Sequence, residues 1–562
     1  MSDTSLPRNG GQILVDTLVE NAVDTVYCVP GESYLAVLDA LYDQDGIQTI
    51  VTRHEGAASN MADAYGKLTG RPGICFVTRG PGATHASNGV HTASEDSTPM
   101  ILFIGQVERG FMGRGAFQEV DYRQMFGGLA KWVTDVDSVA RIPEIVAKAF
   151  SIAMSGRPGP VVIGLPDDVL FDTAVVNDVP AVRVTQAAPD TSAMAEFKVL
   201  LEAARQPLVV VGGTGWDRDA TSSLQRFVTA YDLPIASSFR RQDLFDNRDP
   251  HYIGQLGLGV SPQLAARVRD ADLLIVIGSR MAETTSSGYT VIESPVPQQT
   301  LVHVHPDPQE LGRAFQAQLP INAGMRGFAA ALTNLVGTGQ PGDREDVPKP
   351  WQAWTSSARA DYIAHSTPPV PSPDLRGVDL AGVVAHLNEI LPDDAVIANG
   401  AGNYTVWVHR FYRYRQPATE LAPTNGAMGY GFPAAIAAKL QDRQRTVVCF
   451  AGDGCFMMYP QELATAMQFG AAIIVIVVNN GMLGTIRMHQ EKNYPGRVSA
   501  TRLVNPNFVT LAKAFGAHAE CVTETADFPA AFERARNAGV VALIELRTDP
   551  LQITPANRLS QA

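Results

Sequence analysis

Two short polar motifs in the last third of the chain follow two strongly apolar segments. The motif GDG, centred on Asp453, follows residues 446–451, and the motif NN, which ends in Asn480, follows residues 473–478. Both segments are typical of buried strands joined by a helix, and the carboxyl ends of neighbouring parallel strands form the ligand-binding edge of a sheet. A carboxylate, an amide oxygen and a turn carbonyl, taken as that of Met482, suit Mg²⁺ bound together with ligand phosphates.

Glycines surround these oxygen donors. Gly452, Gly454 and Gly484 would let backbone N–H groups approach phosphate oxygens closely. Either motif alone is most often a turn between core strands. Asn480 follows Asp453 by 27 positions, which is the length of one strand–helix–strand unit. The two motifs at this spacing therefore favour a Mg²⁺–diphosphate site over two unrelated turns.

The elements that must position these residues follow one pattern through most of the chain. Short apolar runs rich in β-formers alternate with helix-period segments, which indicates an α/β fold with open parallel sheets. A helix is expected over 56–69 and another opens near 459–462. The remaining expected strands are 25–29, 74–78, 101–104, 208–211, 273–277, 301–304 and 395–398.

Composition shifts divide the chain into three domains. The expected boundaries are an N-terminal domain at 1–178 and a middle domain at 190–338. A linker at 339–375, rich in Pro, Gly and charge, precedes a C-terminal domain at 376–550 and a tail at 551–562. Prolines would stiffen that linker.

The overall composition narrows the possible partners. The 562 residues are 45% hydrophobic and 18% charged, with a net charge of −13. An acidic chain without a basic stripe argues against nucleic acid. The longest unbroken apolar run, 471–478, is eight residues, whereas a membrane span needs about 20. No secretory signal is visible, and the five scattered cysteines suit a reducing compartment, so we expect a cytoplasmic protein with a small-molecule substrate.

Longer motifs resemble the acetohydroxyacid synthase (acetolactate synthase) large subunits, a family of thiamine-diphosphate-dependent enzymes. Besides GDG and NN, the resemblance rests on RHEGAASNMADAYGKLTGRPGICFVTRGPGATH, FIGQV, GAFQEVD, NGAMGYGFPAAIAAKL and QELATAMQFG. It implies a pyrimidine-binding N-terminal domain, a middle domain and a C-terminal diphosphate-binding domain. It also implies thiamine diphosphate and Mg²⁺ as cofactors, held at a subunit interface in a homodimer or homotetramer.

The resemblance assigns the catalytic role to Glu55, in RHEGAAS. In the family this carboxyl hydrogen-bonds the aminopyrimidine ring and drives the tautomer that deprotonates the thiazolium C2, with the cofactor as electron sink. Without the resemblance, a Glu at a helix start would be read as a favourable partner of the helix dipole. Phe117 and Gln118 match the loop that faces the reacting carbon: Gln118 would bond intermediates and Phe117 would wall the pocket.

The resemblance also assigns residues to the cofactor. Met428 matches the bulky aliphatic residue that supports the bent cofactor, and Gly426 would offer its carbonyl to the amino group. Tyr404 and Cys455 depart from the pattern, because the synthases carry histidine and serine there. The expected cofactor set is Gly402, Asn403, Gly426, Met428, Gly452, Gly454, Cys455, Leu483 and Gly484.

Three residues are expected at the substrate. Arg280, in IGSRMAE, matches the arginine that binds the second substrate's carboxylate, whereas Arg79 and His489 depart from the family, which has a small residue and a tryptophan there. His85 likewise replaces an Asn. These changes predict a substrate with a second anionic or hydroxylated group. The alternative is that Arg79 pairs with Glu32 and is structural.

FAD is possible but disfavoured. The residues after Arg280 are Met-Ala-Glu-Thr instead of the synthases' Phe-Asp-Asp-Arg, and GGTG at 212–215 lacks a third glycine. The strand that leads to His305 ends without the acid that normally holds a ribose hydroxyl, although Asp307 lies nearby.

The sequence thus predicts decarboxylation of a 2-oxo acid followed by carboligation of the acyl carbanion to a second carbonyl. A non-ligating 2-oxo acid decarboxylase is one alternative, although the chain contains no His-His pair. A C–C lyase acting on a ketone or a 2-hydroxyacyl-CoA is another. A silent regulatory homologue would be expected to have lost Glu55, Asp453 or Asn480, and all three are present.

Overall fold

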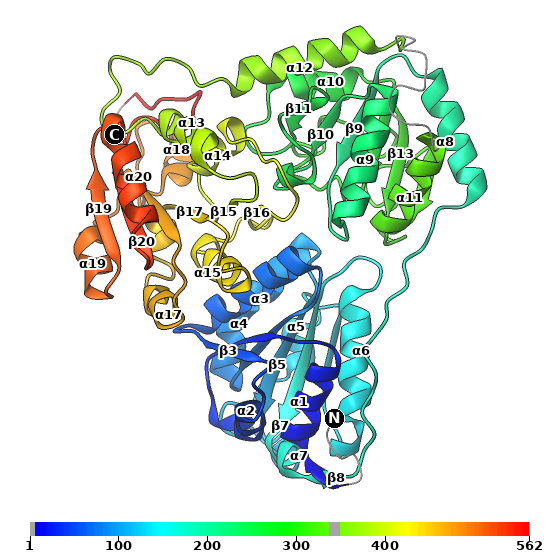
Figure 1. Ribbon diagram of the computed structural model, residues 1–562, viewed down its shortest axis with the longest axis vertical. Helices are drawn as coiled ribbons and strands as arrows, with labels where there is room; N and C mark the ends of the chain where they lie inside the picture. The colour runs from blue at the N-terminus through cyan, green and yellow to red at the C-terminus, as the bar shows by residue number, and fades with distance from the viewer. Residues whose placement is uncertain (1–5, 337–348, 561–562) are drawn as a thin grey trace.

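The computed structural model describes residues 6–336 and 349–560. Within them the chain forms three six-stranded parallel sheets with interleaved helices (Figure 1). The N-terminal sheet lies at the bottom of the view, the middle sheet at the upper right and the C-terminal sheet at the upper left. This confirms the predicted α/β fold with three open parallel sheets.

The N-terminal sheet has the strand order β3-β2-β4-β5-β7-β6, with a small antiparallel pair, β1 and β8, at its margin. Its strands are β1 (Arg8–Asn9), β2 (Thr25–Cys28), β3 (Gln48–Val51), β4 (Gly73–Val77), β5 (Met100–Gln106), β6 (Trp132–Asp135), β7 (Pro160–Pro166) and β8 (Thr173–Ala174). Its helices are α1 (Gly10–Glu20), α2 (Leu35–Tyr42), α3 (Glu55–Thr69), α4 (Gly80–Asp96), α5 (Tyr122–Phe126), α6 (Ile142–Met154) and α7 (Asp167–Phe171). Helices α3 and α4 follow β3 and β4, so both begin at the carboxyl edge of this sheet.

The middle sheet has the order β11-β10-β9-β12-β13-β14. Its strands are β9 (Pro207–Val211), β10 (Ile235–Ser237), β11 (Tyr252–Gln255), β12 (Leu273–Ile277), β13 (Thr300–His305) and β14 (Leu319–Asn322). Its helices are α8 (Thr191–Ala203), α9 (Arg218–Tyr231), α10 (Pro262–Asp270), α11 (Met325–Val336) and α12 (Gln352–Ser366).

The C-terminal sheet has the order β16-β15-β17-β18-β20-β19. Its strands are β15 (Val396–Asn399), β16 (Glu420–Leu421), β17 (Val447–Gly452), β18 (Ile474–Asn479), β19 (His518–Val522) and β20 (Ala542–Arg547). Its helices are α13 (Leu380–Ile390), α14 (Thr405–Phe411), α15 (Gly431–Gln441), α16 (Asp453–Phe456), α17 (Glu462–Gln468), α18 (Gly484–Asn493), α19 (Phe508–Ala514) and α20 (Phe528–Arg536). Each strand expected from the sequence is present, with ends within two residues of the expectation.

Part of the expected linker, 339–375, is helical in the structure. Residues 337–348 lie outside the described residues, but α12 forms within the remainder and packs against β11 and α10. The Trp351 indole donates to the carbonyls of Tyr231 and Asp232, at 2.9 and 3.0 Å, and the Trp354 indole donates to the carbonyl of Pro207 at 3.0 Å. These contacts hold α12 on the middle sheet.

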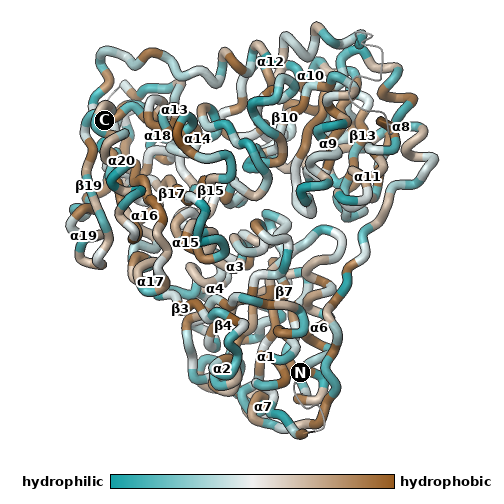
Figure 2. The backbone as a smooth tube through the Cα atoms, in the orientation of Figure 1, coloured by the Kyte–Doolittle hydropathy of each residue, from teal (hydrophilic) through white to brown (hydrophobic). Residues whose placement is uncertain are grey.

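Apolar side chains fill the space between sheets and helices. Figure 2 shows hydrophobic backbone segments concentrated along strands such as β7 and β17. One core cluster continues from the N-terminal into the C-terminal domain, where α3 packs against α15. At that junction Lys67 bonds Asp63 and the Tyr430 hydroxyl, and Tyr430 donates to Asp63 at 2.7 Å. This buried network fixes the N-terminal domain against the C-terminal domain of the same chain.

Among the helices of residues 6–336 and 349–560, none combines the length and the apolar character that a membrane crossing requires.

Candidate active site

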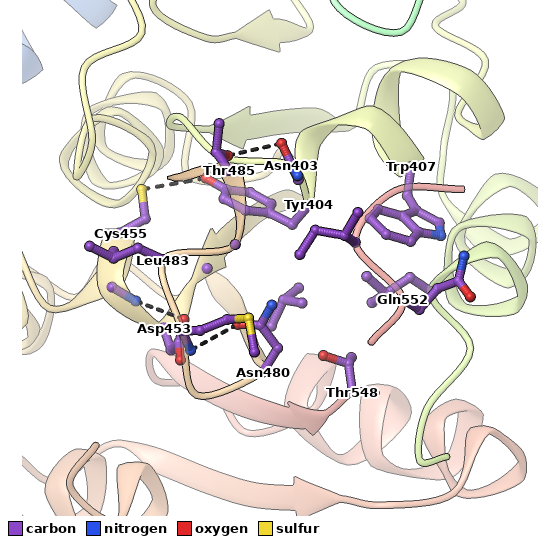
Figure 3. A pocket seen from close by; sticks show the side chains of 18 of the residues that line it. Asn403, Tyr404, Trp407, Asp453, Cys455, Asn480, Leu483, Thr485, Thr548 and Gln552 are labelled. Carbon is purple, nitrogen blue, oxygen red and sulfur yellow. Dashed lines mark hydrogen bonds between the residues drawn. The ribbon is translucent and has the colours of Figure 1, made fainter. Parts of the chain in front are cut away.

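The two polar motifs lie side by side in the folded chain. Strands β17 and β18 pair in parallel, with Gly452 opposite Val478, so Asp453 and Asn480 follow at the same edge of the sheet. They face a cavity of about 130 Å³ in the C-terminal domain (Figure 3). The expected residues that line it are Gly402, Asn403, Met428, Gly452, Asp453, Gly454, Cys455, Asn480, Met482, Leu483 and Gly484.

Asp453 is the buried centre of this cavity. One carboxylate oxygen accepts from the Gly454 N–H at 2.9 Å, and the other accepts from the Gly481 N–H at 2.9 Å and from the Asn505 amide at 2.7 Å. Burial raises the pKa of Asp453, and these three hydrogen bonds oppose that rise. The Asn480 side-chain oxygen accepts from the Met482 N–H at 3.2 Å and so shapes the turn that supplies the expected carbonyl.

The donor set fits a divalent cation. Asp453 is only 3% exposed, and in the described part of the chain no Lys, Arg or His side chain pairs with it. A buried carboxylate without a countercharge is costly, and a cation held by Asp453, Asn480 and the Met482 carbonyl would supply that charge. All three donors are oxygens, as Mg²⁺ requires.

The walls of the cavity fit a diphosphate. A Cβ atom on Gly454 would lie 2.9 Å from the Leu483 side chain, and one on Gly402, where φ is +140°, would lie 2.9 Å from the Tyr404 ring. Only glycine leaves these two stretches of backbone bare, and bare backbone N–H groups are what phosphate oxygens approach.

Proton competition at Asp453 should make metal binding depend on pH. Its raised pKa means that the carboxyl takes up a proton at a higher pH than an ordinary aspartate. A protonated carboxyl cannot ligate Mg²⁺, so the dissociation constant should increase as pH falls through that pKa, by about tenfold per pH unit where one proton is displaced. Titration calorimetry with Mg²⁺ and thiamine diphosphate at several pH values, in buffers of different ionisation enthalpy, would measure the slope and the released proton. A dissociation constant independent of pH would contradict the assignment of Asp453 as ligand.

Tyr404 and Cys455, where the synthases carry histidine and serine, contact each other. The Tyr404 hydroxyl accepts from the Gly400 N–H at 3.0 Å and lies 3.4 Å from the Cys455 sulfur, which itself accepts from the Gly429 N–H at 3.0 Å. Tyr404 is buried and lies against the cavity (Figure 3). The Tyr404 hydroxyl and the Cys455 sulfur thus hold the backbone of Gly400 and Gly429 in place. Asn403 is held by Thr485, whose hydroxyl donates to it at 2.9 Å.

Sequence reasoning missed several residues of this cavity. Asn505, the partner of Asp453, comes from a loop far along the chain, and no motif marks it. The segment after β20 also reaches the cavity: Gln552 and Ile553 line it, and the buried Asp549 anchors the segment by accepting from the N–H groups of Leu551 and Arg376. The full set of additional lining residues is Leu375, Val378, Asp379, Leu380, Ala401, Tyr404, Trp407, Val478, Thr485, Ile486, Thr548, Asp549, Gln552 and Ile553.

A second group of expected residues gathers at the carboxyl edge of the N-terminal sheet. Glu55 opens α3, and a Cβ on Gly82 of α4 would lie 3.6 Å from its carboxylate. The Gln118 carbonyl accepts from the Gly80 N–H at 3.0 Å, and Gln118 has a positive φ of 63°. Phe117 is 75% exposed on the same loop. None of these residues lines the cavity around Asp453 and Asn480 in the same chain. That cavity is called the diphosphate cavity below.

The expected substrate residues are dispersed in the single chain. Arg79 lies 3.8 Å from Glu32, as the structural alternative for it requires. Arg280 bonds Glu95 and Glu310, at 3.3 and 3.2 Å.

Two further expected residues lie apart from these. His489 is exposed on α18 and is not among the residues of the diphosphate cavity. Gly426 has a positive φ of 73° in the loop before Met428, and it too is outside the cavity lining.

Comparison with known proteins identifies the family. Three models match in order: the N-terminal TPP binding domain of thiamine pyrophosphate enzymes at 8–125, their central domain at 194–332 and their C-terminal TPP binding domain at 400–546. The acetolactate synthase isozyme 2 large subunit of Escherichia coli (strain K12) is 30% identical over 97% of this chain and 96% of its own length. The chain belongs to the thiamine pyrophosphate enzymes of the acetolactate synthase type.

Other relatives agree. The acetolactate synthase large subunit of Parasynechococcus marenigrum is 32% identical over 93% of this chain and 85% of its own length, and that of Lactococcus lactis is 31% identical over 91% and 87%. The thiamine pyrophosphate (thiamine diphosphate) cofactor and the three-domain fold expected from the sequence are therefore confirmed. The matched C-terminal domain contains the whole Asp453–Asn480 edge.

A second cavity, of about 390 Å³, lies between all three domains of this thiamine pyrophosphate enzyme and includes Arg280.

At the end of β13, burial lowers the pKa of His305 to about 4, and its ring accepts from the Asp307 N–H at 3.1 Å. A neutral imidazole therefore occupies the position where an acid would hold a flavin ribose.

We predict that the purified protein is colourless. Visible absorbance spectra of the native protein, and of the supernatant after heat denaturation, would check for bound flavin. A yellow protein that releases flavin on denaturation would contradict this prediction.

Proposed function

We propose that the chain binds thiamine diphosphate with Mg²⁺, decarboxylates a 2-oxo acid and ligates the remaining acyl unit to a second carbonyl compound. The observation that carries the proposal is the buried Asp453 carboxylate beside Asn480, which pairs with no cationic side chain of residues 6–336 and 349–560. It lies in a cavity lined by glycine backbone. The relatives' name, acetolactate synthase, supports ligation over simple release of an aldehyde.

In this proposal the residues of the chain have separate tasks. Asp453, Asn480 and the Met482 carbonyl would hold Mg²⁺, and the backbone around Gly402 and Gly454 would hold the diphosphate. Met428, on the cavity wall, would support the bent shape of the cofactor. The cofactor, when bound, supplies an electron sink for the carbon–carbon bond that breaks.

Glu55 would hold and release a proton at the aminopyrimidine of the cofactor. Because Glu55 is not part of the diphosphate cavity in its own chain, a second copy would have to supply it. The proposed active site therefore joins the N-terminal domain of one subunit to the C-terminal domain of another, in a homodimer or homotetramer.

Subunit mixing tests this arrangement. The variants E55Q and D453N, each expected to be inactive alone, would be co-expressed with different tags and purified as mixed oligomers. If sites are shared between subunits, half of the sites in each mixed dimer have both residues intact, and the purified mixed dimers should have about half of the native activity. No recovery in verified mixed dimers would show that each chain builds its own site.

The reaction itself is tested with a panel of 2-oxo acids, including pyruvate and dicarboxylic acids, while CO₂ and organic products are followed together. A ligated product, such as acetolactate from pyruvate, supports the proposal. CO₂ with aldehyde alone would indicate a decarboxylase. Absence of CO₂ from every acid, with cofactor demonstrably bound, would indicate a C–C lyase on a ketone or 2-hydroxyacyl-CoA.

A further inference from the structure

His85 contacts the carboxylate that the proposed function makes catalytic. Its Nδ1 lies 2.8 Å from a carboxylate oxygen of Glu55, although 30 residues separate the two in sequence. The contact arises because α3 and α4, which follow β3 and β4 on either side of β2, pack against each other. The Glu55 side chain is 14% exposed and the His85 side chain is 51% exposed. The imidazole thus connects a nearly buried carboxylate to solvent.

A second histidine defines which ring can carry the proton. His54 stacks on His85 with 4.6 Å between ring centroids, and its Nδ1 accepts from the Gly56 N–H at 2.9 Å. That nitrogen therefore has no proton, and burial together with the neighbouring His85 lowers the pKa of His54. His54 Nδ1 thus has no proton to give to Glu55, and His85 is the ring whose Nδ1 contacts that carboxylate.

The C-terminal domain of the same chain holds this group in place. The Tyr459 ring lies edge-on to His54 at 5.3 Å, and Glu462 accepts from the Arg53 N–H at 3.1 Å. A Cβ on Gly56 would lie 2.4 Å from the Tyr459 hydroxyl, so the start of α3 has no room to move toward that domain.

We propose that His85 is a positioning residue that orients the Glu55 carboxyl and exchanges its proton with water. This inference rests on the proposed function of Glu55. In the step, protonated His85 transfers the Nδ1 proton to the Glu55 carboxylate: the N–H bond breaks, an O–H bond forms, and the neutral ring, which keeps its Nε2 proton, regains a proton at Nδ1 from hydronium in the solvent. Ligation of a decarboxylated 2-oxo acid anion consumes one proton per turnover, so a route for that proton is required.

A metal ion is the competing interpretation of the same three side chains. His54, Glu55 and His85 have ligand atoms within 4.8 Å of one another. However, the hydrogen bond from Gly56 already uses His54 Nδ1, and the Glu55 oxygen nearest to His85 is at hydrogen-bond distance. Metal analysis of the native protein and of H85N separates the two: a stoichiometric metal lost with His85 would overturn the proton-exchange proposal.

The decisive readout is hydrogen–deuterium exchange at C2 of bound thiamine diphosphate, followed by NMR after acid quench, because it requires no substrate. The native rate should fall as pH rises, because the proposed transfer to Glu55 needs a proton on His85 Nδ1. H85N keeps a hydrogen-bond donor in place but cannot titrate. The exchange rate of H85N should lack this pH-dependent fall, called the pH limb below. At low pH, H85N should exchange about tenfold more slowly than the native protein, because only water then supplies the proton.

Further variants isolate the role of the ring. H85A should be as slow as H85N or slower, and added imidazole should restore part of its rate, because the site of His85 is half open to solvent. Glu462 titrates near neutral pH, since burial raises its pKa to about 7, so E462Q should keep the pH limb. H518N is the matched control: His518 also lies 2.8 Å from a glutamate, Glu520, remote from both cavities.

Unchanged exchange rates and pH profiles in folded H85N and H85A, with cofactor affinity retained, would overturn the proposal. A rate lowered in H85A but fully restored in H85N, with the pH limb intact, would also overturn it, because hydrogen bonding alone would then suffice. If no 2-oxo acid is turned over but the exchange limb depends on His85, the proposed function fails while this inference stands.

Discussion

E55Q is expected to lower turnover by about 10²–10⁴-fold, the usual contribution of a side chain that transfers a proton in the reaction. Glutamine has the shape of glutamate and retains a hydrogen bond to His85, but it cannot exchange a proton. The side chain is nearly buried and lies outside the diphosphate cavity of its own chain. Affinity for thiamine diphosphate and Mg²⁺ should therefore change only a few-fold, so turnover and binding separate in this variant.

Steady-state turnover and titration calorimetry on the same preparation would measure both quantities. E144Q is the matched control, because Glu144 occupies the first turn of α6 as Glu55 does in α3, and pairs with Arg141 on the surface. If Glu55 merely complements the helix dipole, both variants should lose similar, small amounts of stability and keep their turnover. Retention of most activity in E55Q would contradict the catalytic assignment.

Local patterns were sufficient to predict the nine strands named from the sequence and the meeting of Asp453 and Asn480 at one edge of a sheet. Continuous apolar runs such as 273–277 are buried on both faces in parallel sheets and stand out in any sequence. The GDG and NN motifs follow β17 and β18 directly, so the spacing along the chain determines their meeting in space. Two strands paired in parallel leave no other place for the residues that follow them.

Contacts between distant segments could not be predicted in this way. Asn505 reaches Asp453 from a loop 52 residues later, and His85 reaches Glu55 only because two helices pack together. The helix α12 was missed because proline and glycine around it suggested a linker. Its anchors, the Trp351 and Trp354 indoles, bond backbone carbonyls of the middle domain that no local pattern reveals. In each case tertiary packing, rather than local preference, decides the outcome.

D453N is expected to weaken binding of Mg²⁺ together with thiamine diphosphate by at least about 100-fold. Changes to groups that only support a metal ligand already cost about 10–100-fold in affinity, and this change removes the one charged ligand of the proposed set. The substitution keeps the size of the side chain, and it also removes a buried charge that pairs with no cationic side chain in the described part of the chain. The protein without cofactor should therefore remain folded and even gain stability.

Titration calorimetry and thermal unfolding, each with and without Mg²⁺ and thiamine diphosphate, would measure both effects. The native protein should unfold at a higher temperature when both ligands are present, because ligands that bind only the folded state stabilise it, whereas D453N should show no such shift. N505A should lie between them, since Asn505 only orients the carboxylate through its 2.7 Å hydrogen bond.

D442N is the control, because Asp442 is an exposed turn residue that accepts from the Gln444 N–H. If Asp453 were likewise only a turn residue, D453N and D442N would behave alike and both would keep the ligand-induced shift. A shift lost in D453N, reduced in N505A and intact in D442N would instead locate the metal at the edge between β17 and β18.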